Sequence, residues 1–292
     1  MATGVPSLVP MTNRTPRVAL VTGATQGLGL ALVEGLARRL DAADTVYLTG
    51  RDAGRVADAV AGMPRTGARV RGELFDVADP AAAARLADVI AERHGGVDVV
   101  FGNAVMRVGP DDDPRAVMDE YTQVNNFGTT RLMRAFAPLV RDGGRFLVVA
   151  SSLGTLHHLA PVLHGRFDRA ASLDEVDKQV AAWRDAVQDG SAAAGAWPAF
   201  VNIPSKIAQV AAVRALAGER RAEDLRRGIL LAAVCPGMIN TPTSGLWWDV
   251  SGAATPAEAA VPLLDLALNP IDPAHYGELV RYGRALPWRP AA

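Results

Sequence analysis

Hydrophobic positions along this chain fall into two alternating patterns. From Arg17 onward, short runs of β-branched and other apolar residues alternate with longer segments in which apolar residues recur every three to four positions. The first pattern predicts buried strands and the second predicts amphipathic helices, and their alternation is typical of βαβ units. We therefore predict one doubly wound, parallel, seven-stranded Rossmann sheet with helices on both faces. The predicted strands are RVALVTG, TVYLTG, RVRGELFDV, VDVVFGN, RFLVVAS, GILLAAVCPG and GELVRYG.

Two segments interrupt this alternation. Residues 153–198 are far longer than a usual connection between a strand and a helix. Within them, SLDEVDKQVAAWRDAV begins with Ser172, a favourable N-cap residue, and has one apolar face. We expect an inserted helix there that covers the ligand edge of the sheet. The second segment, residues 240–258, contains Gly, Pro and the adjacent Trp247 and Trp248, and we interpret it as a lid.

Composition limits the classes of partner. The chain has 292 residues, of which 49% are hydrophobic and 21% are charged, so one large core can form. The net charge of −1 provides no strong field to hold nucleic acid or an anionic membrane surface. No signal-peptide pattern or membrane-spanning run is present in the sequence. We expect a flexible tail at residues 1–15, a single cytoplasmic domain at 16–292, and a small-molecule substrate.

Cysteine and histidine usage argues against a disulfide or a metal site. Cys235 is the only cysteine, so an internal disulfide cannot form, and its expected role is that of a small buried hydrophobe. The five histidines show no compact ligand spacing. We predict no metal.

The segment TGATQGLG joins the first predicted strand to the first predicted helix. Its glycines allow a tight turn and let backbone N–H groups at the helix N-terminus approach a pyrophosphate. In this context the segment predicts a dinucleotide site. The predicted contacts from this loop are Gly23, Thr25, Gln26, Gly27, Leu28 and Gly29.

The spacing Gly-x-x-x-Gly-x-Gly is similar to that of the short-chain dehydrogenase/reductase family, and five further motifs support the resemblance. FDV ends the third predicted strand, GNAV keeps part of the family's Asn-Asn-Ala-Gly turn, and VNNFG carries its helix Asn. VVASS carries the catalytic Ser, and CPGMINT reproduces Pro-Gly-x-x-x-Thr. The resemblance covers roughly residues 16–285 and implies the family's fold. It also implies cofactor contacts from Asp76 (to the adenine amino group), Val77, Asn103, Ala104, Lys206, Pro236, Gly237 and Thr241.

Within that family, GAWPAFVNIPSK and the insertion before it are most similar to the carbonyl reductases. In those relatives the insertion covers the helix face used for tetramer assembly. The resemblance therefore implies a monomer.

The end of the second predicted strand bears on the choice between NAD and NADP. Gly50 stands where an acid that binds a 2′-hydroxyl would lie, and Arg51 follows it. Arg suits a 2′-phosphate through its bidentate fork, and the missing acid removes repulsion. We predict NADP (NADPH), although Gln26 occupies a loop position where NADP-preferring relatives often carry a second basic residue.

One position departs from the family's catalytic pattern. The resemblance implies that a Ser orients a carbonyl, a Tyr protonates its oxygen as hydride arrives, a Lys supports the Tyr and binds ribose, and an Asn completes a water relay. Ser152, Lys206 and Asn125 match, but Asn202 stands in place of the Tyr. An amide donates hydrogen bonds but releases no proton near pH 7, so acid catalysis worth about 10²–10⁴-fold is lost unless another group supplies it.

Replacement acids are few. His157 and His158 follow Ser152, and a histidine can donate a proton near neutral pH. Tyr121 lies one helical turn before Asn125, and we expect it to pack in the core. The two tryptophans of 240–258 either cover an apolar ring or pack on the core.

Three functions remain open at this point. The first is an atypical NADP-dependent reductase of a cationic imine, a conjugated alkene, or a carbonyl with a relocated acid. The second is a non-redox cyclase, isomerase or dehydratase that uses Asn202, Ser152 and a His to polarise a carbonyl. The third is a catalytically silent nucleotide-binding protein. Val105 bears on the choice, because a branched side chain replaces the family's Gly near the nicotinamide ribose.

Overall fold

An eight-stranded sheet forms the centre of the computed structural model, which describes residues 14–64 and 67–290. The strand order is β3-β2-β1-β4-β5-β6-β7-β8, and every neighbouring pair is parallel except β7 and β8. This confirms the predicted doubly wound class. The strands are β1 (Val18–Val21), β2 (Thr45–Gly50), β3 (Arg69–Leu74), β4 (Val97–Gly102), β5 (Val140–Val149), β6 (Leu230–Val234), β7 (Leu279–Arg281) and β8 (Arg284–Leu286).

The predicted strand count was wrong by one, because GELVRYG and the residues after it form a hairpin. β7 ends at Arg281, and Tyr282 and Gly283 both have positive φ values, 49° and 70°. Two such residues make the tight two-residue turn whose twist matches paired antiparallel strands. β8 then returns beside β7, with Leu279 opposite Leu286. Strands of only three residues are too short to show an alternating hydrophobic pattern in the sequence.

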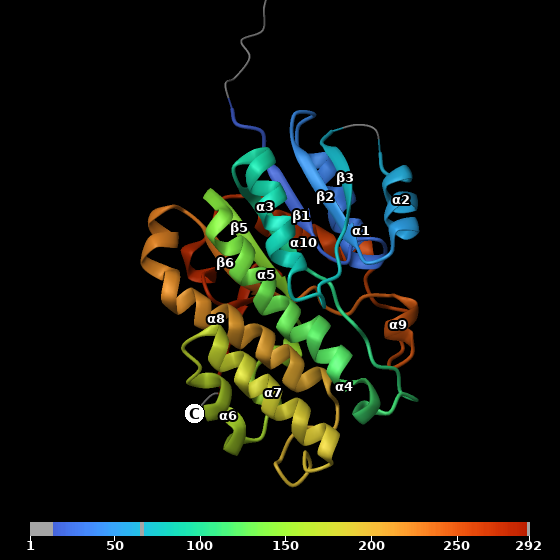
Figure 1. The fold of residues 1–292 in the computed structure, drawn as a ribbon, viewed down its shortest axis with the longest axis vertical. Helices are drawn as coiled ribbons and strands as arrows, with labels where there is room; N and C mark the ends of the chain where they lie inside the picture. Colours follow the sequence, from blue (N-terminus) through green and yellow to red (C-terminus); the bar gives the residue numbers. More distant parts are fainter. Residues whose placement is uncertain (1–13, 65–66, 291–292) are drawn as a thin grey trace, which may run out of the picture.

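Helices cover both faces of the sheet. α3, α5 and α8 lie on one face, and α1 and α10 pack against each other on the other (Figure 1). The central strands β1 and β2 are buried along their whole length, which explains why they are apolar without alternation. The helices are α1 (Gly27–Arg39), α2 (Ala53–Ala61), α3 (Ala82–His94), α4 (Pro114–Thr122), α5 (Gly128–Phe136), α6 (Pro161–Asp168), α7 (Leu173–Asp189), α8 (Asn202–Arg226), α9 (Pro242–Gly245) and α10 (Pro256–Leu268).

The long segment at 153–198 adds a further layer. Ser172 caps α7, and its hydroxyl accepts a hydrogen bond from Glu175 N at 3.2 Å. The apolar face of α7 packs against α4 and α8 (Figure 1). The expected helix is therefore present, but it covers helices and not the strand ends, because its buried residues face α4 and α8.

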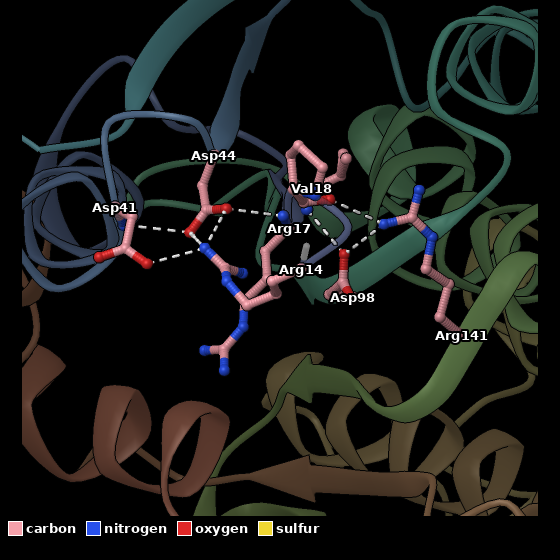
Figure 2. A network of polar contacts seen from close by, with 8 residues as sticks. Arg14, Arg17, Val18, Asp41, Asp44, Asp98 and Arg141 are labelled. Carbon is pink, nitrogen blue, oxygen red and sulfur yellow. Dashed lines mark hydrogen bonds and ion pairs between the residues drawn. The ribbon is translucent and has the colours of Figure 1, made fainter. Parts of the chain in front are cut away.

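Two carboxylates hold the amino end of β1 (Figure 2). Asp44 is buried and accepts hydrogen bonds from Arg17 N at 2.7 Å and from the Arg14 guanidinium at 2.8 Å. Asp98 accepts from Val18 N at 2.7 Å and from Arg141 Nη1 at 2.9 Å. The N–H groups of Arg17 and Val18 are thereby satisfied.

Two expectations concern the ends and the surroundings of the chain. Most of the tail expected at 1–15 lies outside the described residues. Among the helices that the structure describes, none is both long and apolar enough to cross a membrane.

Candidate active site

The site lies at the point in the sheet where the order of the strands reverses. β1 sits between β2 and β4, so the loops after β1 and β4 leave the sheet toward opposite faces. A crevice at the carboxyl ends of such strands is where open α/β sheets bind ligands. Most of the predicted site residues follow β1, β2, β3, β4, β5 or β6, whose carboxyl ends meet at this one edge of the parallel sheet. Asn125 lies on a π-helical turn, and Asn202 and Lys206 lie on α8.

The glycine loop after β1 is packed tightly against the loop after β4. Gly23 has φ +62°, and a Cβ there would lie 2.7 Å from Ala104 Cα. A Cβ on Gly29 would lie 2.4 Å from Gly23 O. Thr22 Oγ1 joins the two loops by accepting from the N–H groups of Asn103 and Ala104, each at 2.9 Å. These two glycines are required by the close approach of the backbone.

The first turn of α1 is open toward the crevice. A Cβ on Gly27 would meet no atom within 4 Å, and the side chain of Gln26 makes no capping hydrogen bond. The first N–H groups of α1 are thus free of a side-chain cap, and the space in front of them suits a phosphate.

Two arginines, Arg51 and Arg55, lie shortly after the end of β2. The exposed Arg51 forms an ion pair with Glu120 at 3.3 Å, and Arg55 in the first turn of α2 donates to Gln26 Oε1. The sequence analysis missed Arg55, which lies in α2 three residues after its N-cap, Asp52. Gly50 has a packing role, because a Cβ there would lie 2.6 Å from Thr25 Cγ2.

The segment after β3 is also held in place. Asp76 Oδ1 accepts from Ala78 N at 2.9 Å. Val77 lies directly over Gly128, where a Cβ would come within 2.6 Å of Val77 Cγ2. Val77 therefore lies beside the start of α5, and Asp76 directly precedes it.

Asn125 anchors the loop after β4 from a π-helical turn, Gln123–Phe127. Its Oδ1 accepts from Met106 N at 2.8 Å, and its Nδ2 donates to Met106 O at 2.9 Å. The side-chain amide of Gln209 donates to Asn125 O at 2.9 Å. A π-turn of this kind frees backbone groups from the regular ladder and often marks a functional site.

Lys206 is linked to Asn125 through a residue that the sequence analysis missed. Its Nζ donates to Gln209 Oε1 at 2.7 Å and to Val149 O at 3.3 Å. Gln209 thus joins the ammonium to the Asn125 carbonyl, where the resemblance implied a water relay. Burial lowers the pKa of Lys206 to about 8, and the charge of Arg107 acts in the same direction.

Asn202 is the first residue of α8 and is bonded to Tyr121. The Tyr121 hydroxyl donates to Asn202 Oδ1 at 2.7 Å. Tyr121 is completely buried, as expected for a packing residue, and its ring meets Trp183 edge-on at 6.4 Å. Burial raises the pKa of Tyr121 to about 12. The phenol therefore has a polar role in addition to packing.

Ser152 is half-buried at the start of a short 3₁₀ turn, Ser152–Gly154, that packs closely on α8. A Cβ on Gly154 would lie 2.9 Å from Lys206 O, so this turn and the helix bearing Lys206 touch. His157 and His158 follow on a second 3₁₀ turn and are both exposed. Neither side chain forms a hydrogen bond with any residue in the described part of the chain.

The loop after β6 meets the loop after β4 through Arg107. Thr241 caps α9 and accepts from Arg107 Nη1 at 3.3 Å. Gly237 has φ +82°, and a Cβ there would lie 2.2 Å from the Tyr282 hydroxyl. Pro236 before it is buried. Sequence analysis gave no signal for Arg107, which has no ion-pair partner among the residues described.

Aromatic side chains lie beside the loop that follows β4. Trp247 donates from Nε1 to Val108 O at 3.1 Å, and its ring lies 5.2 Å from that of Phe200. Trp248 lies 5.9 Å from the same ring. Both tryptophans remain partly exposed, as is Val105, whose side chain is not packed into the protein. A cavity of about 160 Å³ adjoins Trp247 and Phe200.

Comparisons with known proteins identify similar sequences and similar folds. Residues 17–161 match the model of the short chain dehydrogenase family. Carbonyl reductase (NADPH) 1 of Mus musculus is 32% identical over 281 residues, which cover 93% of this chain and 98% of that protein. Menthone neomenthol reductase from Mentha piperita has a TM-score of 0.74 at 24% identity, covering 93% of this chain and 100% of that one. NADPH-bound carbonyl reductase from chicken fatty liver has a TM-score of 0.67 at 20% identity, covering 94% and 100%.

Proposed function

Because the chain belongs to the short-chain dehydrogenase/reductase family, we propose that it is an NADP-dependent oxidoreductase of the carbonyl reductase type with an atypical active site. The observation that carries the proposal is the open space at Gly27, in front of the first turn of α1, together with Arg51 and Arg55 after β2. It is supported by the names of the relatives, which include carbonyl reductase (NADPH) 1.

The chain's own residues fit the cofactor. The uncapped turn of α1 would bind the pyrophosphate, and Arg51 and Arg55 would bind the 2′-phosphate. Asp76 would contact the adenine, and Lys206 and Thr241 the nicotinamide half. When bound, NADPH supplies a hydride to the substrate.

Ser152 and Asn202 would orient the substrate. Ser152 lies on the 3₁₀ turn that packs on α8, and Asn202 is the first residue of α8. Each can donate a hydrogen bond to a substrate oxygen or nitrogen. Neither releases a proton near pH 7, so the site favours acceptors that need no acid at a heteroatom. A cationic imine takes hydride directly, and a conjugated alkene takes its proton at carbon.

For a carbonyl acceptor, we propose Lys206 as the relocated acid. Its ammonium has two of its three donors engaged, by Gln209 and Val149, so one remains for the crevice. A pKa of about 8 matches a general acid that works near neutral pH. Tyr121 retains its proton at this pH, and His157 and His158 remain weaker candidates because they contact no other site residue.

The experiment that tests this function mixes the purified protein with NADPH and four probes: an aromatic ketone, a quinone, a conjugated enone and a cyclic iminium salt. Consumption of NADPH with the enone or the iminium ion is expected to exceed that with the ketone. Binding of NADPH without consumption, together with chemical conversion of a probe, would instead favour the non-redox alternative. Binding alone, with no conversion of any probe, would favour the catalytically silent one.

We also propose that the protein is monomeric, because α7 already covers parts of α4 and α8 that could otherwise face another copy. Light scattering should give a mass near 30.7 kDa, and a stable tetramer would contradict this. The cytoplasmic location stays a prediction.

A further inference from the structure

The side-chain amide of Asn202 forms a hydrogen bond through its oxygen and, among the described residues, none through its nitrogen. Its Oδ1 accepts from the Tyr121 hydroxyl at 2.7 Å. Its Nδ2 has no hydrogen-bond partner among the described residues, yet it does not belong to the buried polar atoms that lack one. The amino group is therefore accessible, on the side of the amide away from the buried phenol.

The Tyr121 phenol is the donor in this hydrogen bond. A phenol has one proton to give, and an amide oxygen can only accept it. Burial raises the pKa of Tyr121 to about 12, despite the opposite effect of Ser205 and Asn125, so the hydroxyl remains protonated across the neutral range. In the structure this proton is donated to Asn202 Oδ1, and Nδ2 lies on the opposite side of the amide.

The insertion holds the phenol in this position. Tyr121 comes from α4, and its ring packs edge-on against Trp183 of α7. Trp183 is itself completely buried and lies 6.3 Å from Trp197. Since dense packing restricts the ring to one rotamer, the phenol oxygen stays beside Asn202.

We propose that Tyr121 is a positioning residue that fixes the Asn202 amide with its N–H groups toward the substrate. The inference rests on the proposed function, in which Asn202 polarises the acceptor. Without the phenol's proton, the amide can rotate and present its oxygen, which would repel a substrate oxygen. The Tyr of the family pattern is thus replaced by a hydrogen-bond donor that is oriented by a second, buried tyrosine.

The test compares Tyr121→Phe, Asn202→Ala and the double variant, with menadione as the carbonyl probe and NADPH in excess. Loss of an oriented donor typically costs about 10²-fold in kcat, which we expect for Asn202→Ala. Tyr121→Phe should lower kcat about tenfold with little change in KM, because the ring and its packing remain. The double variant should be no slower than Asn202→Ala alone, since Tyr121 acts only through Asn202.

Tyr47→Phe is the matched control. Tyr47 is also completely buried, and its hydroxyl bonds to His94 Nε2 at 2.9 Å, outside the candidate site. This variant should retain wild-type turnover. An unchanged kcat in Tyr121→Phe, or additive losses in the double variant, would overturn the proposal.

A second measurement does not depend on turnover. The ¹³Cγ resonance of Asn202, assigned by its absence in Asn202→Asp, should move upfield in Tyr121→Phe as the carbonyl loses its hydrogen bond, and should stay unchanged in Tyr47→Phe. An unchanged resonance in Tyr121→Phe would refute the inference. Failure of the wild type to reduce any probe would count against the proposed function only, because the resonance still reports the positioning contact.

Discussion

Replacing Lys206 by methionine should make the cofactor-free protein more stable while damaging its site. A lowering of the pKa from 10.5 to about 8 corresponds to about 3 kcal/mol of unfavourable free energy for the charged form. The residue is half-buried, so this is an upper limit. Methionine removes the charge but also the hydrogen bonds to Gln209 and Val149, worth about 1 kcal/mol each. The expected net gain in unfolding free energy at pH 7 is about 1–2 kcal/mol.

The pH dependence of the stability difference shows whether the buried charge of Lys206 causes it. The folded protein holds the Lys206 proton less tightly than the unfolded chain, so the penalty is complete below about pH 8 and disappears as pH rises toward 10.5. Between pH 7 and pH 9, the wild type should gain about 1 kcal/mol relative to the variant.

Urea unfolding of both proteins at several pH values measures this difference. Lys178 and Lys206 are the only lysines in the chain, and the exposed Lys178 provides the control Lys178→Met, which should change little. Lysine side-chain NMR then shows two signals, and the one from Lys206 should titrate near pH 8. A stability difference that is absent at pH 7, or constant from pH 7 to pH 9, would refute the assignment of a desolvated ammonium.

The other predictions concern the departure from the family pattern, the cofactor and the fold. Asn202→Tyr should lower turnover of the native substrate, because the added ring competes for the space beside Tyr121; a higher ketone reductase rate would instead indicate a damaged site. Arg55→Ala should weaken NADPH binding about tenfold in calorimetry and leave NADH unchanged, and Arg51→Asp should reverse or abolish the preference; equal affinities in the wild type would contradict both. Asp224→Ala should lower the unfolding free energy by about 3 kcal/mol, because the buried Asp224 accepts from Tyr276 and Arg220, each at 2.8 Å; thermal unfolding close to that of the wild type would show that these bonds are replaced by solvent.

Much of the fold could be predicted from the sequence, because burial and backbone conformation restrict which residues can stand at particular positions. A strand buried on both sides must be apolar throughout, as β1 and β2 are, and a turn with positive φ beside another backbone must be glycine, as at Gly23. Such requirements act on consecutive residues, so they leave a pattern in the chain. The glycine loop and the parallel sheet could therefore be predicted, whereas the roles of Ser152, Lys206 and Asn125 were implied by the resemblance and stay predictions.

The contacts that distinguish this site join residues far apart in the chain. Tyr121 and Asn202 are separated by 81 positions, and Arg107 and Thr241 by 134. Gln209 is only three positions from Lys206, but glutamine on a helix is ordinarily exposed, and its role depends on the carbonyl of Asn125 on another helix.

The sequence alone, through its resemblance to the family, predicted that Asn202 stands where the family pattern has a tyrosine. It did not establish which group lies against the amide, because several packings of α4 on α8 preserve the same apolar pattern. Only the tertiary structure decides this. In it, Tyr121 packs against Trp183 of α7 and donates a hydrogen bond to the amide oxygen of Asn202. A hydrogen bond needs its two atoms about 3 Å apart with the correct orientation, and periodicity in the sequence does not fix position or orientation that closely.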